Sequence, residues 1–110
     1  MALAFKRAFS GVLGTSLTPL YTADGVDFQT DQVTLTNNSG TDATVSIWTP
    51  SGGGPSDGDL VLKNKSITAG STVTAFELRG HVLQNGMQLF ALPSVAGVVT
   101  LAVSGRTKTV

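Results

Sequence analysis

The sequence predicts an all-β protein, folded as an antiparallel β-sandwich or barrel of seven to eight short strands. Apolar and hydroxyl-bearing residues alternate with a period of two in several segments, the pattern of a half-buried strand. Clusters of Gly, Pro, Asn and Asp separate these segments at intervals of about ten residues. No segment has a convincing helical pattern, so neither a helix bundle nor a parallel α/β sheet is expected.

The clearest strand signal lies at residues 33–48. Val33 and Leu35 alternate with threonines in the first half, and Val45 and Ile47 alternate with Thr and Ser in the second. The intervening residues 37–42, Asn-Asn-Ser-Gly-Thr-Asp, tolerate left-handed backbone angles or bond to their own backbone. We therefore expect a β-hairpin here, with one apolar and one hydroxyl-rich face.

Residues 1–14 are expected to form a first strand or an assembly arm, and residues 15–110 a single β-sandwich domain. Phe5, Phe9 and Leu13 have helical spacing, but the glycines at positions 11 and 14 disfavour a helix. A free arm with this many apolar groups would be a liability on a soluble monomer. Our hypothesis is that it contacts another subunit, with Lys6 and Arg7 near acidic loops.

The segment at residues 15–22 is expected to be an edge strand, because Pro19 cannot donate a ladder hydrogen bond. Further along, Val26 and Phe28 have the opposite parity to Val33 and Leu35. A change of parity requires an extra residue in the strand, so we expect a bulge at residues 30–32.

The second half of the chain predicts a flexible exposed loop followed by strands. Residues 49–58 contain four glycines and two prolines, and no Lys-Ser/Thr follows to make a phosphate loop. Strands are expected at residues 59–62, 72–78, 87–92 and 98–104, with a tight turn at Asn85-Gly86. The predicted core consists of Leu35, Val45, Ile47, Leu60, Leu62, Phe76, Leu78, Leu89, Leu101 and Val103.

Length and composition limit the possible functions. A chain of 110 residues fits one domain. Basic and acidic residues number seven each, whereas nucleic-acid-binding domains usually carry a basic excess. No apolar run reaches the roughly 20 residues of a membrane span, and the basic pair follows the apolar opening residues, unlike a secretory signal. We expect neither a nucleic-acid nor a membrane partner, and the absence of cysteine excludes disulfides.

The charges are unevenly distributed along the chain. Six of the seven acidic residues lie within residues 24–59, and every Lys and Arg lies outside that span. One interpretation is that the Asp residues cap turns while Lys residues protect strand edges. The alternative is head-to-tail packing, with the acidic loops of one subunit against the basic termini of the next.

The residue inventory argues against an enzyme. His81 is the only histidine, no serine has a nucleophile-elbow context, and the only glutamate, Glu77, lies in a predicted strand. Asp57 and Asp59 supply too few oxygens for calcium, so we expect no metal and no cofactor. Trp48 departs from the inward parity of its strand, so it either covers the end of the core or anchors an interface.

Several segments together resemble small β-sandwich virion proteins of tailed bacteriophages, among them Leu-x-Asn-x-x-Gly at residues 35–40. The others lie at residues 20–23, 33–47, 67–72, 85–91 and 98–105. The resemblance implies a non-enzymatic structural protein: a head decoration protein, a head–tail connector (neck or collar) component, or a tail-associated protein. Such a subunit would be made in the host bacterial cytoplasm and would form homo-oligomers and contacts with other virion proteins.

Two further expectations concern this function. The candidate subunit contacts are Phe5, Lys6, Arg7, Phe9 and Trp48. The alternative function is a carbohydrate- or host-surface-binding β-sandwich module, which would use Trp48, Tyr21 and the Asp-rich loops.

Overall fold

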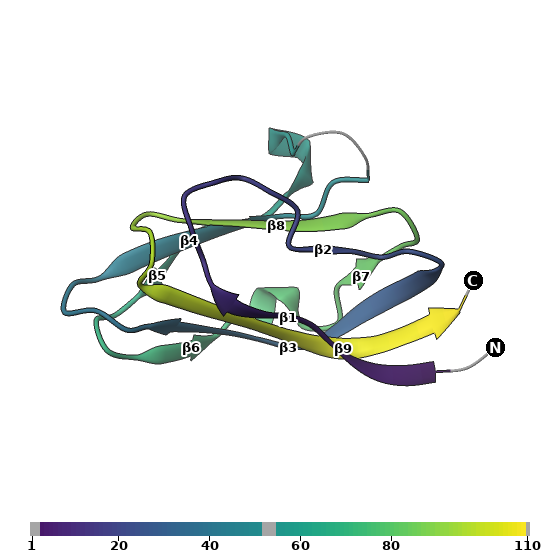
Figure 1. Ribbon diagram of the computed structural model, residues 1–110, viewed down its shortest axis with the longest axis horizontal. Helices are drawn as coiled ribbons and strands as arrows, with labels where there is room; N and C mark the ends of the chain where they lie inside the picture. Colours follow the sequence, from purple (N-terminus) through teal and green to yellow (C-terminus); the bar gives the residue numbers. More distant parts are fainter. Residues whose placement is uncertain (1–2, 52–54, 110) are drawn as a thin grey trace.

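The computed structural model describes residues 3–51 and 55–109 and has two antiparallel sheets packed face to face (Figure 1). This architecture confirms the predicted β-sandwich. The first sheet has the order β1-β9-β3-β6, and β7 also pairs with β3; the second has the order β2-β8-β4-β5. The strands are β1 (Leu3–Val12), β2 (Tyr21–Thr22), β3 (Val26–Asn37), β4 (Ala43–Trp48), β5 (Leu60–Ile67), β6 (Thr72–Thr74), β7 (Val82–Leu83), β8 (Gln88–Pro93) and β9 (Val99–Thr109). Two short 3₁₀ helices, η1 (Asp57–Asp59) and η2 (Phe76–Leu78), complete the described elements.

The core fills the space between the sheets. On β3 and β9, Val33 lies opposite Val103 and Leu35 opposite Leu101, and all four side chains are buried. Alternation of side chains along each strand produces this shared face. Eight of the ten predicted core residues are buried, and the two exceptions are Leu60 and Phe76.

The two exceptions have local structural causes. The strand predicted at residues 72–78 is wrong beyond Thr74, because β6 ends there and the chain turns into η2. This turn leaves the side chain of Phe76 67% exposed, whereas Leu78 still enters the core. Leu60 is half-buried because it opposes Trp48 at a point where the β4–β5 register shifts.

The predicted hairpin at residues 33–48 is wrong, although its two arms are strands. β3 belongs to the first sheet and β4 to the second, so the turn between them crosses from one sheet to the other. β4 pairs instead with β5 and β8. The crossing is held by Asn37, which is fully buried at the end of β3.

The side chain of Asn37 uses its whole hydrogen-bonding capacity. Its amide group donates to the carbonyl oxygens of Thr41 (2.7 Å) and Ile67 (3.0 Å). Its carbonyl oxygen accepts from the backbone N–H (3.1 Å) and hydroxyl (2.8 Å) of Ser39. Because Ile67 ends β5, this one side chain links a strand of the first sheet to a strand of the second.

The bulge predicted at residues 30–32 is confirmed, since the β3–β9 register shifts between Thr30 and Gln32. Gly105 lies opposite Thr30 and is buried. A Cβ atom at Gly105 would collide with the carbonyl oxygen of Gln29 and would lie 2.9 Å from the Phe28 ring. The bulge therefore requires glycine at this position of β9.

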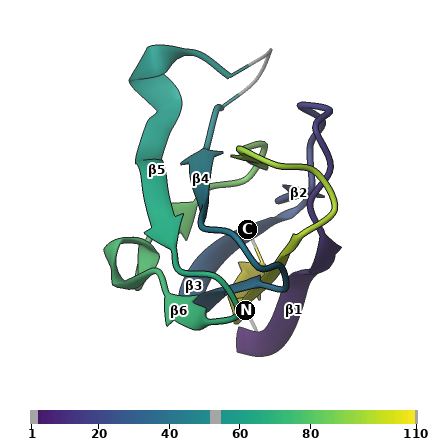
Figure 2. The same ribbon diagram turned by 90° about the vertical axis from the view of Figure 1, so that its left-hand side faces the viewer.

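Only two residues of the edge strand predicted at 15–22 are a strand, namely β2 at the edge of the second sheet. The preceding residues form a connection that crosses one side of the sandwich, from the first sheet to the second (Figure 1). The end-on view shows β1 and β2 on this side, and β5 and β6 on the other (Figure 2).

The tight turn at Asn85-Gly86 is confirmed. The N–H of Met87 donates to the carbonyl of Gln84 at 2.8 Å, and Gly86 has a φ of 94° that favours glycine. This turn also connects the two sheets, because β7 pairs with β3 and β8 pairs with β2 and β4.

Candidate subunit interface

The N-terminal segment is part of the first sheet. β1 pairs antiparallel with β9 of the same chain along its whole length, from Leu3 opposite Lys108 to Val12 opposite Thr100. Phe9 turns inward and packs against the core. Gly11 accommodates its ring, because a Cβ atom there would lie 3.3 Å from the end of the ring.

An irregularity between Arg7 and Phe9 decides which side chains of β1 face inward. Because of this extra residue, Lys6 lies opposite the buried Gly105, and its ammonium group is 5.8 Å from the centre of the Tyr21 ring. This geometry is typical of a cation–π interaction. Arg7 lies opposite Ser104 and faces outward.

The five residues predicted to contact other subunits therefore do not form one patch. Phe5 and Arg7 share the outer face of β1, and the Phe5 side chain is 89% exposed. Lys6 and Phe9 are on the inner face. Trp48 belongs to the second sheet, where it lies opposite Phe90 and Leu60.

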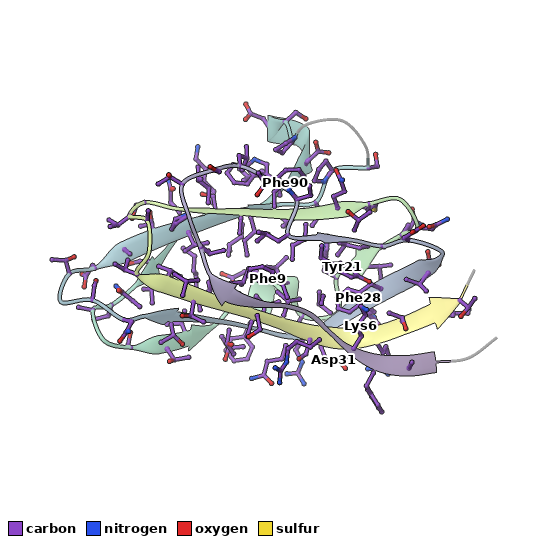
Figure 3. The ribbon with its side chains drawn as sticks, in the orientation of Figure 1. Lys6, Phe9, Tyr21, Phe28, Asp31 and Phe90 are labelled. Atoms are coloured by element: carbon purple, nitrogen blue, oxygen red, sulfur yellow. The ribbon has the colours of Figure 1, made fainter. Side chains whose placement is uncertain are left out.

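Trp48 and Phe90 are neighbours across β4 and β8 on the outer face of the second sheet. Figure 3 shows Phe9, Tyr21 and Phe28 between the sheets, whereas Phe90 lies on the far side of β8. Phe90 is nevertheless only 4% exposed and does not belong to the main core cluster. Trp48 is half-buried and lies opposite it across β4 and β8.

The outer face of the first sheet combines exposed apolar groups with polar ones. Phe5, Arg106, Gln29 and Val82 lie in one row across β1, β9, β3 and β7. Towards Val12, the following rows on β9 and β3 carry Ser, Thr, Gln and Ala side chains. Shallow hollows on this face are lined by residues that include Arg7, Ser10, Asp31, Gln32, Thr34, Thr74, Phe76, Arg79 and Ser104. Phe76 is the exposed aromatic residue that sequence reasoning assigned to the core.

Most of the acidic residues within residues 24–59 have an intramolecular role. Asp27 accepts the backbone N–H of Asn85 (2.8 Å), Asp42 that of Ala69 (3.0 Å) and Asp59 that of Ser56 (3.0 Å). Asp31 forms an ion pair with Arg106 at 2.9 Å on the outer face of the first sheet. Turn capping thus accounts for much of the uneven charge distribution.

The titratable groups with shifted pKa values are structural. Partial burial lowers the pKa of His81, whose Nε2 lies 3.2 Å from the hydroxyl of Thr49. Burial raises the pKa of Tyr21, whose ring centre is 5.1 Å from that of Phe28. The pKa of Glu77 is lowered, first by a backbone hydrogen bond and then by Lys65.

The alternative glycan platform does not assemble from the residues expected for it. Tyr21 lies between the sheets, Trp48 lies on the outer face of the second sheet, and the Asp side chains bond to separate turns. Within the described ranges, no group of three or more His, Cys, Asp or Glu side chains is arranged to hold a metal. No helix in the same ranges is long and apolar enough to cross a membrane.

Comparison of the chain with family models, curated proteins and solved structures finds no match. The fold class therefore rests on the topology itself, and the function on the sequence resemblance and the surface of the sandwich.

Proposed function

We propose that this chain is a non-enzymatic structural subunit of a tailed-bacteriophage virion, a head decoration protein or a neck or tail component. The sequence resemblance supports the virion assignment. The observation that carries the structural role is Phe5, an aromatic side chain 89% exposed on the edge strand β1. A buried Phe contributes roughly 1.5–3 kcal/mol, so leaving one exposed forgoes stability that a partner would supply.

Other exposed apolar side chains extend the same surface. Val12 stands on the outer face of β1 and is 59% exposed. Val82, on β7, lies in the same row as Phe5, and Phe76 flanks the sheet beyond β6. In a subunit that assembles, these groups would be buried between copies or against another virion protein, with the Ser, Thr and Gln side chains forming the polar part of the interface.

The first test is mass spectrometry of purified particles, with copy numbers relative to the major capsid protein. A copy number close to that of the capsid protein indicates head decoration, and one close to that of a ring protein indicates the neck or tail. Absence of the chain from particles would refute the virion assignment.

The second test concerns the surface. We expect Phe5→Ser to leave the melting temperature nearly unchanged, because surface substitutions usually alter stability by less than about 0.5 kcal/mol. Incorporation into particles should fall strongly, because the exposed aromatic anchor is lost. Val95→Ser is the matched control, since Val95 is also an exposed apolar residue but lies in the turn between β8 and β9. Equal incorporation of both variants would exclude Phe5 as a contact.

A further inference from the structure

The sandwich has four sheet edges, and they differ in how well they are protected against an added strand. β2, β6 and β7, which are two, three and two residues long, are too short to template another strand. β5 has eight residues, but Lys63 and Lys65 flank Asn64, whose φ of 51° and the nearby register shifts distort the edge. Charges and bulges of this kind are the usual protection of an edge.

β1 is longer and less protected, since it has one irregularity, between Arg7 and Phe9, whereas β5 has two register shifts and the left-handed Asn64. It has ten residues, and its only neighbour within the described chain is β9, so one side of its backbone has no paired strand. Lys6 does not protect this edge, because its ammonium group lies over Tyr21. Arg7 is the remaining charge at the edge, between the exposed apolar side chains of Phe5 and Val12.

We propose that β1 is an acceptor edge that binds an extended acidic segment of a different protein by strand addition. The inference rests on the proposed function, in which that protein is another component of the virion. Backbone hydrogen bonds along β1 would supply affinity, and the side chains of Phe5, Arg7 and Val12 would supply specificity. The incoming strand would place apolar residues beside Phe5 and Val12 and a carboxylate beside Arg7.

A second copy of this chain fits the edge poorly. Near-complete overlap of two β1 strands about a two-fold axis at Arg7 places the two Arg7 side chains opposite each other. If β1 instead paired with β5 of another copy, Arg7 would lie near Lys63 and Lys65 of that strand. Like charges opposite each other across strands are destabilising, so the chain's own long edges are unfavourable partners.

An acidic occupant fits the charges on the adjoining face. Arg106 and Lys108 lie on β9 beside the N-terminal half of β1; Asp31 forms the 2.9 Å ion pair with Arg106, and Asp27 lies opposite Lys108 on β3. Arg7 makes no ion pair within the part of the chain that the structure describes. A carboxylate beside Arg7 would therefore complete the pairing of this surface.

The edge is tested on the isolated chain with a tethered strand. Residues 1–2 are replaced by a ten-residue strand and an Asn-Gly turn, so that the added strand folds back on β1 at high effective concentration. One version carries Glu opposite Arg7 and Val beside Phe5 and Val12; the matched version carries Lys in place of Glu. Amide hydrogen exchange of β1 and the melting temperature are measured for both versions and for the parent.

We expect the Glu version to slow exchange of the β1 amides roughly fivefold more than the Lys version, an advantage that shrinks in high salt. Arg7→Glu should reverse the order of the two versions, which a purely structural role of Arg7 would not do. Equal protection by both versions, or no added protection of β1, overturns the proposal. A dimer of the parent chain that protects the same amides also overturns it, because the occupant would then be a second copy.

The natural occupant is identified in particles. Since the chain has no cysteine, Val12→Cys gives a single attachment site for a crosslinker at the edge. A crosslink to an acidic extended segment of another virion protein is the expected result, and a crosslink between two copies of the chain overturns it. Absence of the chain from particles would refute the virion function, whereas the tethered-strand result would still decide the acceptor edge.

Discussion

The two halves of β3 are each held by one buried polar residue, through networks of different kinds. At its end, Asn37 bonds only to backbone groups and to the hydroxyl of Ser39, none of which titrates. At the bulge, the hydroxyl of Thr30 donates to the carbonyl of Leu78 and accepts the backbone N–H of His81 at 3.1 Å. The ring of His81 then reaches Thr49 at the end of the second sheet.

This difference shows two ways of linking the sheets of a sandwich without a disulfide. The Asn37 link is direct, since one amide reaches the last residue of β5. The Thr30 link is indirect, because it holds the η2 loop, and a partly buried imidazole of that loop makes the contact across the sandwich. Both are satisfied networks, since no buried side-chain nitrogen or oxygen in the described residues lacks a partner.

The largest effect is expected at the bulge, from Gly105→Ala. Its new Cβ would meet the Gln29 carbonyl and the Phe28 ring, so β3 and β9 would have to separate where the bulge brings them together. Overpacking usually costs about 1–3 kcal/mol, and we expect about 3 kcal/mol or more because one of the clashing groups is backbone. Urea unfolding measures the change.

Gly40→Ala is the control for this substitution, because nothing lies within 4 Å of its Cβ position and its φ is not left-handed. If Gly105→Ala were as stable as Gly40→Ala, the close approach of β3 and β9 at the bulge would be incorrect.

The next effect is expected at the other end of β3, from Asn37→Ala. The substitution leaves the carbonyl of Ile67 without its donor in a buried site, at roughly 1–3 kcal/mol, whereas the carbonyl of the exposed Thr41 still accepts the Ser39 hydroxyl. With the loss of the other Asn37 hydrogen bonds, we expect a total of about 2 kcal/mol. Asn38→Ala, at an exposed neighbouring position, should change stability by less than about 0.5 kcal/mol. Similar losses in both variants would mean that Asn37 does not hold the crossing.

These two residues also show how far sequence reasoning could go. Parity alone located the bulge, because Phe28 and Val33 cannot both face inward in an uninterrupted strand. The same parity places Asn37 inward after Val33 and Leu35, a signal that the turn chemistry concealed. Turn-forming residues indicate that the chain reverses, but they do not indicate whether the next strand joins the same sheet. The expected hairpin failed for this reason.

The surface was harder to predict than the interior. Burial follows alternation, so eight of the ten predicted core residues are buried, but Phe76 lies beyond a strand that ends early, and propensity did not reveal that end. On β1, the irregularity after Arg7 moves Lys6 inward and leaves Phe5 and Arg7 outward. Which side chains of the N-terminal segment are exposed therefore depends on an irregularity that the sequence does not signal.

The smallest expected effect is a pH dependence of the unfolding free energy, which should be present in the Thr30–His81 network and absent from the Asn37 network. Partial burial lowers the pKa of His81 below its ordinary value of about 6.5, so folding favours the neutral ring. The contribution of the neutral ring to stability is complete above pH 6.5 and declines as pH falls from there toward the lowered pKa of the folded state. His81→Gln keeps a hydrogen-bonding group near Thr49 and removes this titration.

We therefore expect the unfolding free energy of the parent chain to decrease between pH 7.5 and 5.5 and that of His81→Gln to change less. Asn37→Ala should retain the full pH dependence of the parent, since its network contains no titrating group. If His81→Gln showed the same slope as the parent chain, the titration would lie elsewhere, and the contrast between the two halves of β3 would be one of geometry alone.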